Sequence, residues 1–121
     1  MLKRILVLDD NQDVLDIIKE ALVYGQFEVK VTSNSADIME TIETFHPDLL
    51  ILDYKLNGGN GNDICRQVKT NHQLSDIPVI ICSAYLDATE TLICGCDATI
   101  AKPFGLDELM EKVNGLIYSD M

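Results

Sequence analysis

Five short apolar runs recur along the chain, and segments with helical spacing lie between them. We predict strands at residues 3–8, 27–32, 48–53, 79–82 and 97–101. The run at 27–32 alternates charged and apolar residues, which is typical of a half-exposed edge strand. The runs at 3–8, 48–53 and 79–82 are almost continuously apolar, which predicts strands of a parallel sheet that is covered on both faces.

The intervening segments predict helices that cover such a sheet. They lie at residues 11–24, 35–45, 62–70, 87–94 and 105–118, and residues 57–61 (NGGNG) are expected to form a loop. In the first helix Leu15, Ile18 and Leu22 fall on one stripe, and Gly25 follows where a left-handed glycine often ends a helix. Five strand–helix units without a linker predict one α/β domain over residues 1–121.

Composition and charge narrow the function. The 121 residues are 47% hydrophobic and 24% charged, as in an ordinary globular domain. No apolar run approaches the roughly 18 residues of a membrane span, and the N-terminus becomes acidic too early for a signal peptide. We therefore expect a cytoplasmic protein. The net charge of −11 argues against direct nucleic-acid binding and is compatible with a divalent cation or a basic protein partner.

Polar side chains follow the predicted buried strands. Asp9 and Asp10 end the first strand, Asp53 the third, Ser83 the fourth and Lys102 the fifth. Because the carboxyl ends of parallel strands meet at one edge of a sheet, we expect these five side chains to share a crevice.

The charges of this crevice predict its chemistry. Two carboxylates about 5 Å apart repel each other by roughly 3 kcal/mol at an effective dielectric constant of 20. Lys102 offsets one of the three negative charges, and Mg²⁺, which prefers carboxylate and water oxygens, would offset the remaining two. An aspartate beside Mg²⁺ and a lysine can attack phosphorus and become an acyl phosphate.

Each of these residues also has a simpler interpretation. Asp10 or Asn11 could cap the first helix, and Asp53 could be a turn residue. Ser83 could be a loop hydroxyl and Lys102 a surface charge. Together these interpretations require four independent coincidences at one edge of the sheet, so we favour the shared site.

Four segments carry a family resemblance. VLDDN, LLILD with Gly61 eight residues after its aspartate, PVIICSA and KPF occur in the order and spacing of response-regulator receiver domains. The chain resembles this family, which includes chemotaxis regulators, over essentially all 121 residues. The resemblance implies a flavodoxin-like, doubly wound sheet of five parallel strands in the order 2-1-3-4-5.

The resemblance also implies the metal site. Asp10 and Asp53 would be direct Mg²⁺ ligands, Asp9 would act through water, and the backbone carbonyl of Lys55 would complete the protein ligands.

The remaining site residues follow from the same resemblance. Asp53 would be the phosphoacceptor, Ser83 the switch hydroxyl and Lys102 the lysine that binds the phosphoryl group. A cis bond between Lys102 and Pro103 is also implied.

The implied function is signalling by phosphorylation. A histidine kinase or phosphotransfer protein would phosphorylate Asp53, and a switched surface would then contact a downstream protein. The domain would catalyse only its own phosphorylation and dephosphorylation, without contacting membranes. No output domain is expected in this chain. A pseudo-receiver that never takes phosphate is the alternative.

Two other protein classes fit less well. A flavodoxin needs a Ser/Thr/Gly-rich phosphate loop after the first strand, where this chain has Asp9 and Asp10. A phosphatase with an aspartyl nucleophile needs Asp-x-Asp at the end of that strand, whereas these two aspartates are adjacent.

Three departures from the family pattern stand out. Leu56-Asn57 replaces the usual Met-Pro, Lys55 precedes them, and Thr99 stands where the family usually has Tyr or Phe. The missing aromatic ring puts the usual coupling to output in doubt.

Overall fold

The computed structural model describes residues 2–56, 59–84 and 95–118, and its centre is a five-stranded parallel sheet. The strand order is β2-β1-β3-β6-β7. These strands are β1 (Arg4–Leu8), β2 (Glu28–Thr32), β3 (Leu49–Asp53), β6 (Val79–Ser83) and β7 (Ala98–Ala101). A separate two-stranded ribbon, β4 (Lys55–Leu56) and β5 (Gly59–Asn60), follows β3. Without this ribbon the order is 2-1-3-4-5, which confirms the predicted fold class.

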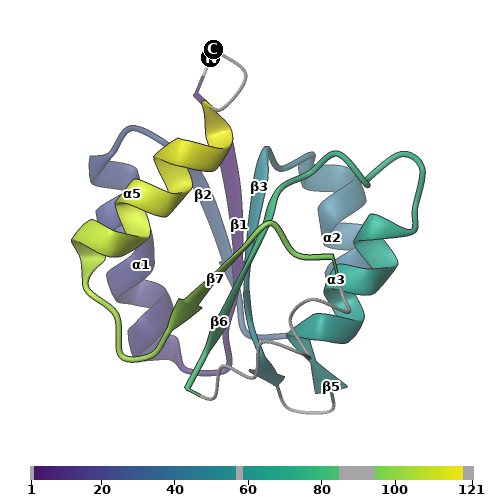
Figure 1. The fold of residues 1–121 in the computed structure, drawn as a ribbon, viewed down its shortest axis with the longest axis horizontal. Helices are drawn as coiled ribbons and strands as arrows, with labels where there is room; N and C mark the ends of the chain where they lie inside the picture. Colours follow the sequence, from purple (N-terminus) through teal and green to yellow (C-terminus); the bar gives the residue numbers. More distant parts are fainter. Residues whose placement is uncertain (1, 57–58, 85–94, 119–121) are drawn as a thin grey trace.

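Helices cover both faces of the sheet. In Figure 1, α1 (Gln12–Tyr24) and α5 (Leu106–Ile117) lie on one side, and α2 (Ile38–Phe45) and α3 (Gly61–Lys69) lie on the other. Leu6 and Leu8 of β1 belong to the buried cluster under α2 and α3, and Ile5 and Val7 belong to the cluster under α1 and α5. Successive residues of β1 thus fill opposite core layers, which explains its continuous apolar run.

Two segments differ from the sequence prediction. The helix predicted from residue 35 begins at Ile38, because the Asn34 side-chain oxygen accepts the Ala36 N–H at 2.8 Å in a local turn that competes with helix. The segment predicted as a loop, residues 57–61, contains β5, which pairs with β4 so that Lys55 lies opposite Asn60 and Leu56 lies opposite Gly59. The helix predicted at 87–94 lies outside the described residues.

Gly25 does not have the left-handed conformation that was expected of it. Its φ is −76°, and the left-handed residue after α1 is Gln26, with φ 71°. A Cβ on Gly25 would lie 2.6 Å from Cε of Met110 in α5, so an added side chain would require the flexible end of Met110 to move.

No helix in the described ranges is long and apolar enough to cross a membrane.

Candidate functional site

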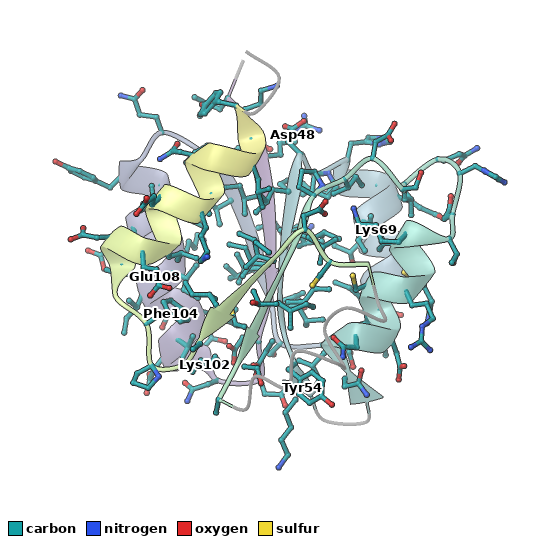
Figure 2. All side chains as sticks on the ribbon, in the orientation of Figure 1. Asp48, Tyr54, Lys69, Lys102, Phe104 and Glu108 are labelled. Atoms are coloured by element: carbon teal, nitrogen blue, oxygen red, sulfur yellow. The ribbon has the colours of Figure 1, made fainter. Side chains whose placement is uncertain are left out.

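The carboxyl ends of four neighbouring strands bring the predicted side chains together. Asp53 at the end of β3 lies in register with Cys82, and Ser83 at the end of β6 lies in register with Ala101. The next backbone N–H, that of Lys102, donates to the Ser83 carbonyl at 2.8 Å. Figure 2 shows Lys102 and Tyr54 at this edge and Asp48 at the opposite one.

Lys102 joins two of the carboxylates. Its Nζ lies 2.8 Å from Oδ2 of Asp9 and 3.1 Å from Oδ1 of Asp53. The Asp53 side chain is 13% exposed and that of Lys102 is 23% exposed, so these charges are only partly solvated. One ammonium group therefore bridges aspartates from adjacent strands.

Asp9 is fixed at both oxygens. Its Oδ2 accepts the Lys102 bond, and its Oδ1 accepts the backbone N–H of Asn11 at 2.9 Å. The Asn11 side chain caps α1 by accepting the Val14 N–H at 3.2 Å. The capping residue of α1 is thus Asn11, and Asp10 is not needed for that role.

The electrostatics of the cluster raise two pKa values. Burial raises the pKa of Asp53, the Lys102 hydrogen bond lowers it, and the negative charges of Asp9 and Asp10 raise it again, with a net upward direction. Burial lowers the pKa of Lys102, but its hydrogen bonds and ion pairs with Asp9 and Asp53 outweigh burial, and the net direction is again upward. The site therefore favours the protonated form of Lys102 and disfavours the ionised form of Asp53.

A small cavity opens beside Asp53, the predicted phosphoacceptor. Its volume is about 280 Å³, and the described residues that line it are Asp53, Tyr54, Lys55, Ser83, Ala84 and Lys102. Four of them, namely Asp53, Lys55, Ser83 and Lys102, are predicted site residues. Ser83 is buried, and Lys55 is exposed at the rim.

The residues fit a hard divalent cation by their chemistry. The carboxylates of Asp9 and Asp53 pair with Lys102, and the negative charges of Asp9 and Asp10 add to burial in raising the pKa of Asp53. In the described part of the chain, no three Asp, Glu, His or Cys side chains are grouped closely enough to hold a metal ion. The ligand set of Asp9, Asp10, Asp53 and the Lys55 carbonyl therefore stays a prediction.

Two further predictions concern Thr99 in β7 and the Lys102–Pro103 bond that follows this strand. The Lys102–Pro103 bond is cis, as the resemblance implied. Thr99 is half-buried in β7, in register with Ile81.

Sequence reasoning missed two contacts that shape the site and the structural reason for one glycine. Tyr54 lines the cavity, and the backbone N–H of Asn11 holds Asp9. Gly61 donates its N–H to the Tyr54 carbonyl at 2.7 Å, and a Cβ there would overlap the Asp53 carbonyl oxygen. Gly61 was noticed only by its spacing, because a close backbone approach leaves no signal in hydrophobic periodicity.

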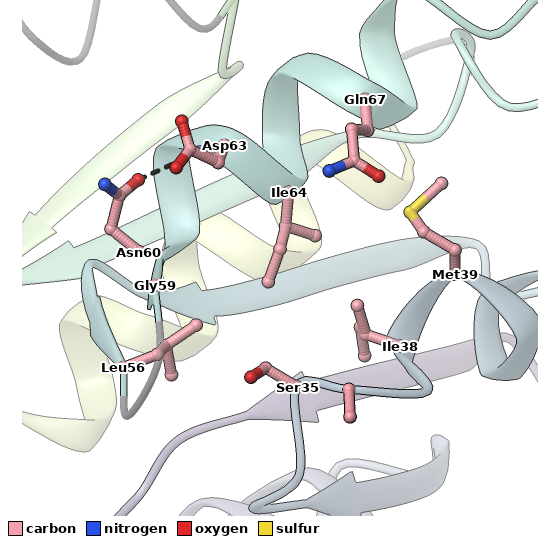
Figure 3. Close-up of a pocket in the computed structure, with 10 residues that line it drawn as sticks. Ser35, Ile38, Met39, Leu56, Gly59, Asn60, Asp63, Ile64 and Gln67 are labelled. Atoms are coloured by element: carbon pink, nitrogen blue, oxygen red, sulfur yellow. Dashed lines mark hydrogen bonds between the residues drawn. The ribbon is translucent and has the colours of Figure 1, made fainter.

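A second cavity of about 280 Å³ lies apart from these residues. Figure 3 shows it between α2, α3 and the β4–β5 ribbon, with Ile38, Leu56 and Ile64 among its apolar lining residues. The Asn60 side chain at its edge accepts the Asp63 N–H at 2.9 Å and so caps α3. None of the predicted site residues lines this second cavity.

Comparison with known proteins decides the family. The family model of the response regulator receiver domain matches residues 5–114. This chain belongs to that family. The response regulator MprA of Mycobacterium ulcerans is 29% identical to this receiver domain over 117 residues, and that of Mycobacterium avium is 28% identical. Each match covers 94% of this chain but 50% of the relative, so the receiver domain spans about half the length of these curated relatives.

Solved structures agree with the receiver fold. A CheY-like response regulator receiver domain protein from Methanospirillum hungatei has a TM-score of 0.90 at 26% identity, covering 98% of this chain and 96% of that one. A putative response regulator from Chloroflexus aurantiacus, 24% identical, has a TM-score of 0.91 and covers 98% and 99%. The chain is thus a response regulator receiver domain of two-component signalling.

Proposed function

We propose that this receiver domain accepts a phosphoryl group on Asp53 from the phosphohistidine of a histidine kinase or phosphotransfer protein in the cytoplasm. The observation that supports this most is the Lys102 ammonium between Asp53 and Asp9, beside a cavity that Ser83 also lines. A carboxylate oxygen of Asp53 forms the new bond to phosphorus as the bond from phosphorus to the histidine nitrogen breaks. The histidine keeps the electron pair of that bond.

The protein groups around Asp53 have separate tasks. The Lys102 ammonium can pair with a phosphoryl oxygen, and the Ser83 hydroxyl can donate to another. Asp9 keeps Lys102 in place through the 2.8 Å ion pair. Water later attacks phosphorus, which releases inorganic phosphate and restores the Asp53 carboxylate. The domain thus acts only on itself and is not an enzyme with a separate substrate.

Mg²⁺ is the cofactor that this donor set favours. Asp10, Asp53 and the Lys55 carbonyl would hold it directly, and Asp9 would act through water. When bound, the ion would neutralise charge on the phosphoryl oxygens. This role requires the carboxylates of Asp10 and Asp53 to turn towards a shared position.

Labelling with a small phosphodonor tests the proposal. Acetyl phosphate and Mg²⁺ should add one phosphoryl group, seen as an acid-stable and base-labile mass increase. Asp53→Asn should abolish the increase, and Asp76→Asn, a change at an exposed aspartate, should leave it unchanged. Labelling that persists in Asp53→Asn would disprove the assignment.

One observation favours a second candidate, a phosphorylation-independent interaction module. The carboxylates are not grouped for a metal in the described residues, and Lys102 lies between two of them. A titration with beryllium fluoride and Mg²⁺ separates the candidates. A spectroscopic change that requires both reagents and Asp53 supports the phosphoacceptor, and no change at saturating Mg²⁺ supports the second candidate.

A further inference from the structure

The second cavity, shown in Figure 3, has an apolar floor and a polar rim. Ile38 of α2, Leu56 of the β4–β5 ribbon and Ile64 of α3 line it, and all three side chains are buried. Asp63 and Gln67 of α3 also line it and are exposed. Its volume of about 280 Å³ lies just below the roughly 300–1,000 Å³ of most small-molecule sites. The cavity can therefore hold a small ligand that has an apolar part.

The rim of this cavity has a negative charge and free hydrogen-bonding groups. Within the described ranges, the side chains of Asp63 and Gln67 form no hydrogen bond or ion pair. No lysine, arginine or histidine is among the described residues that line the cavity. A ligand that matches the rim therefore carries positive charge, with N–H donors for the Asp63 carboxylate and the Gln67 amide oxygen.

A guanidinium group on a short hydrocarbon chain meets both requirements. Its planar set of N–H donors can pair with a carboxylate through two parallel hydrogen bonds and can reach a further acceptor. Its hydrocarbon chain would lie on the buried floor formed by Ile38, Leu56 and Ile64. An anion is disfavoured, because Asp63 lies at the rim and the net charge of the chain is −11.

The β4–β5 ribbon lies between this cavity and the cavity at Asp53. The two cavities share no described lining residue. Leu56 lines the second cavity, whereas Lys55, its neighbour in β4, lines the Asp53 cavity. Lys55 lies opposite Asn60, which also lines the second cavity. An occupant of the second cavity therefore contacts the ribbon that carries the Lys55 carbonyl, a predicted Mg²⁺ ligand.

We propose that the second cavity binds a small alkylguanidinium ion, and that the bound ion restrains the β4–β5 ribbon beside Asp53. The ion pairs with Asp63 and Gln67 and places its hydrocarbon chain on the apolar floor. An arginine side chain of a partner protein has the same chemistry. We favour the free ion, because a specific protein interface buries about 1,200 Å² or more and this site is one small cavity. The effect on the ribbon rests on the function proposed for Asp53, whereas the binding does not.

The probe is n-butylguanidinium, followed through the amide chemical shifts of the isotope-labelled protein. We expect a dissociation constant of roughly 1 mM, because so small a ligand makes few contacts. N-Butylurea has a similar shape without the charge and should bind about three- to tenfold more weakly. Methylguanidinium keeps the charge without the chain and should also bind more weakly. The largest shift changes should fall on residues that line the second cavity, such as Gly59 and Ile64.

Substitutions at the exposed rim change its charge and leave the apolar floor in place. Asp63→Asn should weaken binding of butylguanidinium by about three- to tenfold at low salt and leave binding of N-butylurea unchanged. Asp13→Asn, at an exposed aspartate in the first turn of α1, is the matched control and should have little effect. Gln67→Glu should strengthen binding and Gln67→Lys should weaken it, whereas the same two changes at the exposed Gln73 should do neither.

Titration with Mg²⁺ tests the effect on the ribbon. Calorimetry with saturating butylguanidinium should give an Mg²⁺ affinity about twofold higher than without it, since a restrained ribbon already holds the Lys55 carbonyl in place. By thermodynamic linkage, saturating Mg²⁺ should raise the affinity for butylguanidinium by the same factor. Equal Mg²⁺ affinities would overturn the effect on the ribbon. Absence of Mg²⁺ binding in both titrations would count only against the metal site proposed at Asp53.

Three outcomes would overturn the binding site itself. These are equal affinities for butylguanidinium and N-butylurea, equal effects of the Asp63 and Asp13 variants, and shift changes confined to residues of the Asp53 cavity. A short peptide with a single arginine supplies the last comparison. If it binds more than about tenfold more tightly than butylguanidinium, the assignment to a small ion is overturned in favour of a protein partner.

Discussion

Gly61 lies against the backbone of Asp53 so closely that a Cβ at position 61 would overlap the Asp53 carbonyl oxygen. Gly61→Ala must therefore move the first turn of α3 or the end of β3. We expect it to destabilise the fold by about 1–3 kcal/mol, as overpacking commonly does, and to slow phosphorylation by acetyl phosphate. Urea denaturation and the labelling rate measure the two effects.

Gly59→Ala is the matched control, because a Cβ there meets nothing within 4 Å. If both alanine variants behave like the unchanged protein, the close approach does not constrain the phosphoacceptor.

Asp10→Ala tests the predicted metal ligand. Removing this carboxylate should weaken Mg²⁺ binding about tenfold or more, a change of ~1.4 kcal/mol, and should strongly reduce labelling with acetyl phosphate. Calorimetric titration of Mg²⁺ gives the affinity. Asp13→Ala, in the exposed first turn of α1, should bind Mg²⁺ normally. Unchanged affinity in Asp10→Ala would remove Asp10 from the ligand set.

Asp53→Asn should make stability less dependent on pH. Since the folded protein raises the pKa of Asp53 above 3.8, it holds this proton to higher pH than the unfolded chain does. This contribution to the free energy of unfolding is therefore favourable below 3.8 and is lost as pH rises through the folded pKa. We expect Asp53→Asn to be more stable than the unchanged protein at neutral pH.

Urea denaturation in Mg²⁺-free buffer, from below pH 3.8 to neutral pH, follows this difference. The advantage of the variant should grow with pH, and a constant difference would contradict the raised pKa of Asp53.

Lys55→Ala tests whether a side chain at the rim protects the acyl phosphate. Lys55 is exposed and lines the Asp53 cavity, so its ammonium can cover the phosphoryl oxygens and hinder water. We expect dephosphorylation to accelerate a few-fold, about 1 kcal/mol of barrier, with little change in Mg²⁺ affinity. Decay of the phosphorylated mass in Lys55→Ala and in the exposed control Lys19→Ala measures the effect. Equal or slower decay in Lys55→Ala would show that its side chain does not guard phosphorus.

Lys69→Met tests an ion pair far from the phosphoacceptor. The Lys69 ammonium lies 2.8 Å from Oδ2 of Asp97 and also donates to the carbonyls of Ser75 and Ile77. Its loss removes this donor from the Ser75 and Ile77 carbonyls and leaves Asp97 with the Val79 N–H alone, so we expect a destabilisation of about 2 kcal/mol in thermal or urea denaturation. Lys19→Met, at an exposed position of α1, should change stability by less than about 0.5 kcal/mol. A similar value for both variants would mean that this ion pair contributes little.

The sequence predicted the elements that bury continuous apolar surface and missed those fixed by local geometry. Periodicity located β1, β3 and β6, because each carries apolar residues on both faces. The β4–β5 ribbon has two residues per strand, too few for any period. Gly25 was expected to be left-handed, but Gln26 has that conformation, and Gly25 instead lies beside the Met110 side chain of α5.

The candidate site, like the fold, was predicted from the sequence only in part. Strand ends in the sequence predicted that Asp53, Ser83 and Lys102 lie at one edge, and the structure brings them around one cavity. The Lys102 bridge between Asp9 and Asp53 was not predicted, because it depends on side-chain conformation. The roles of these residues in binding Mg²⁺ and in accepting a phosphoryl group stay predictions.

The ion pair between Asp9 and Lys102 spans 93 residues of the chain. During synthesis on a ribosome, the three carboxylates leave the exit tunnel before the lysine that offsets part of their charge. A nascent chain that ends before β7 has β1 and β3 but no ammonium between their aspartates. Such a chain would present an uncompensated acidic cluster, and its sheet would lack the last strand. Completion of the site thus coincides with completion of the sheet, so nascent chains stalled before β7 should be unable to accept phosphate.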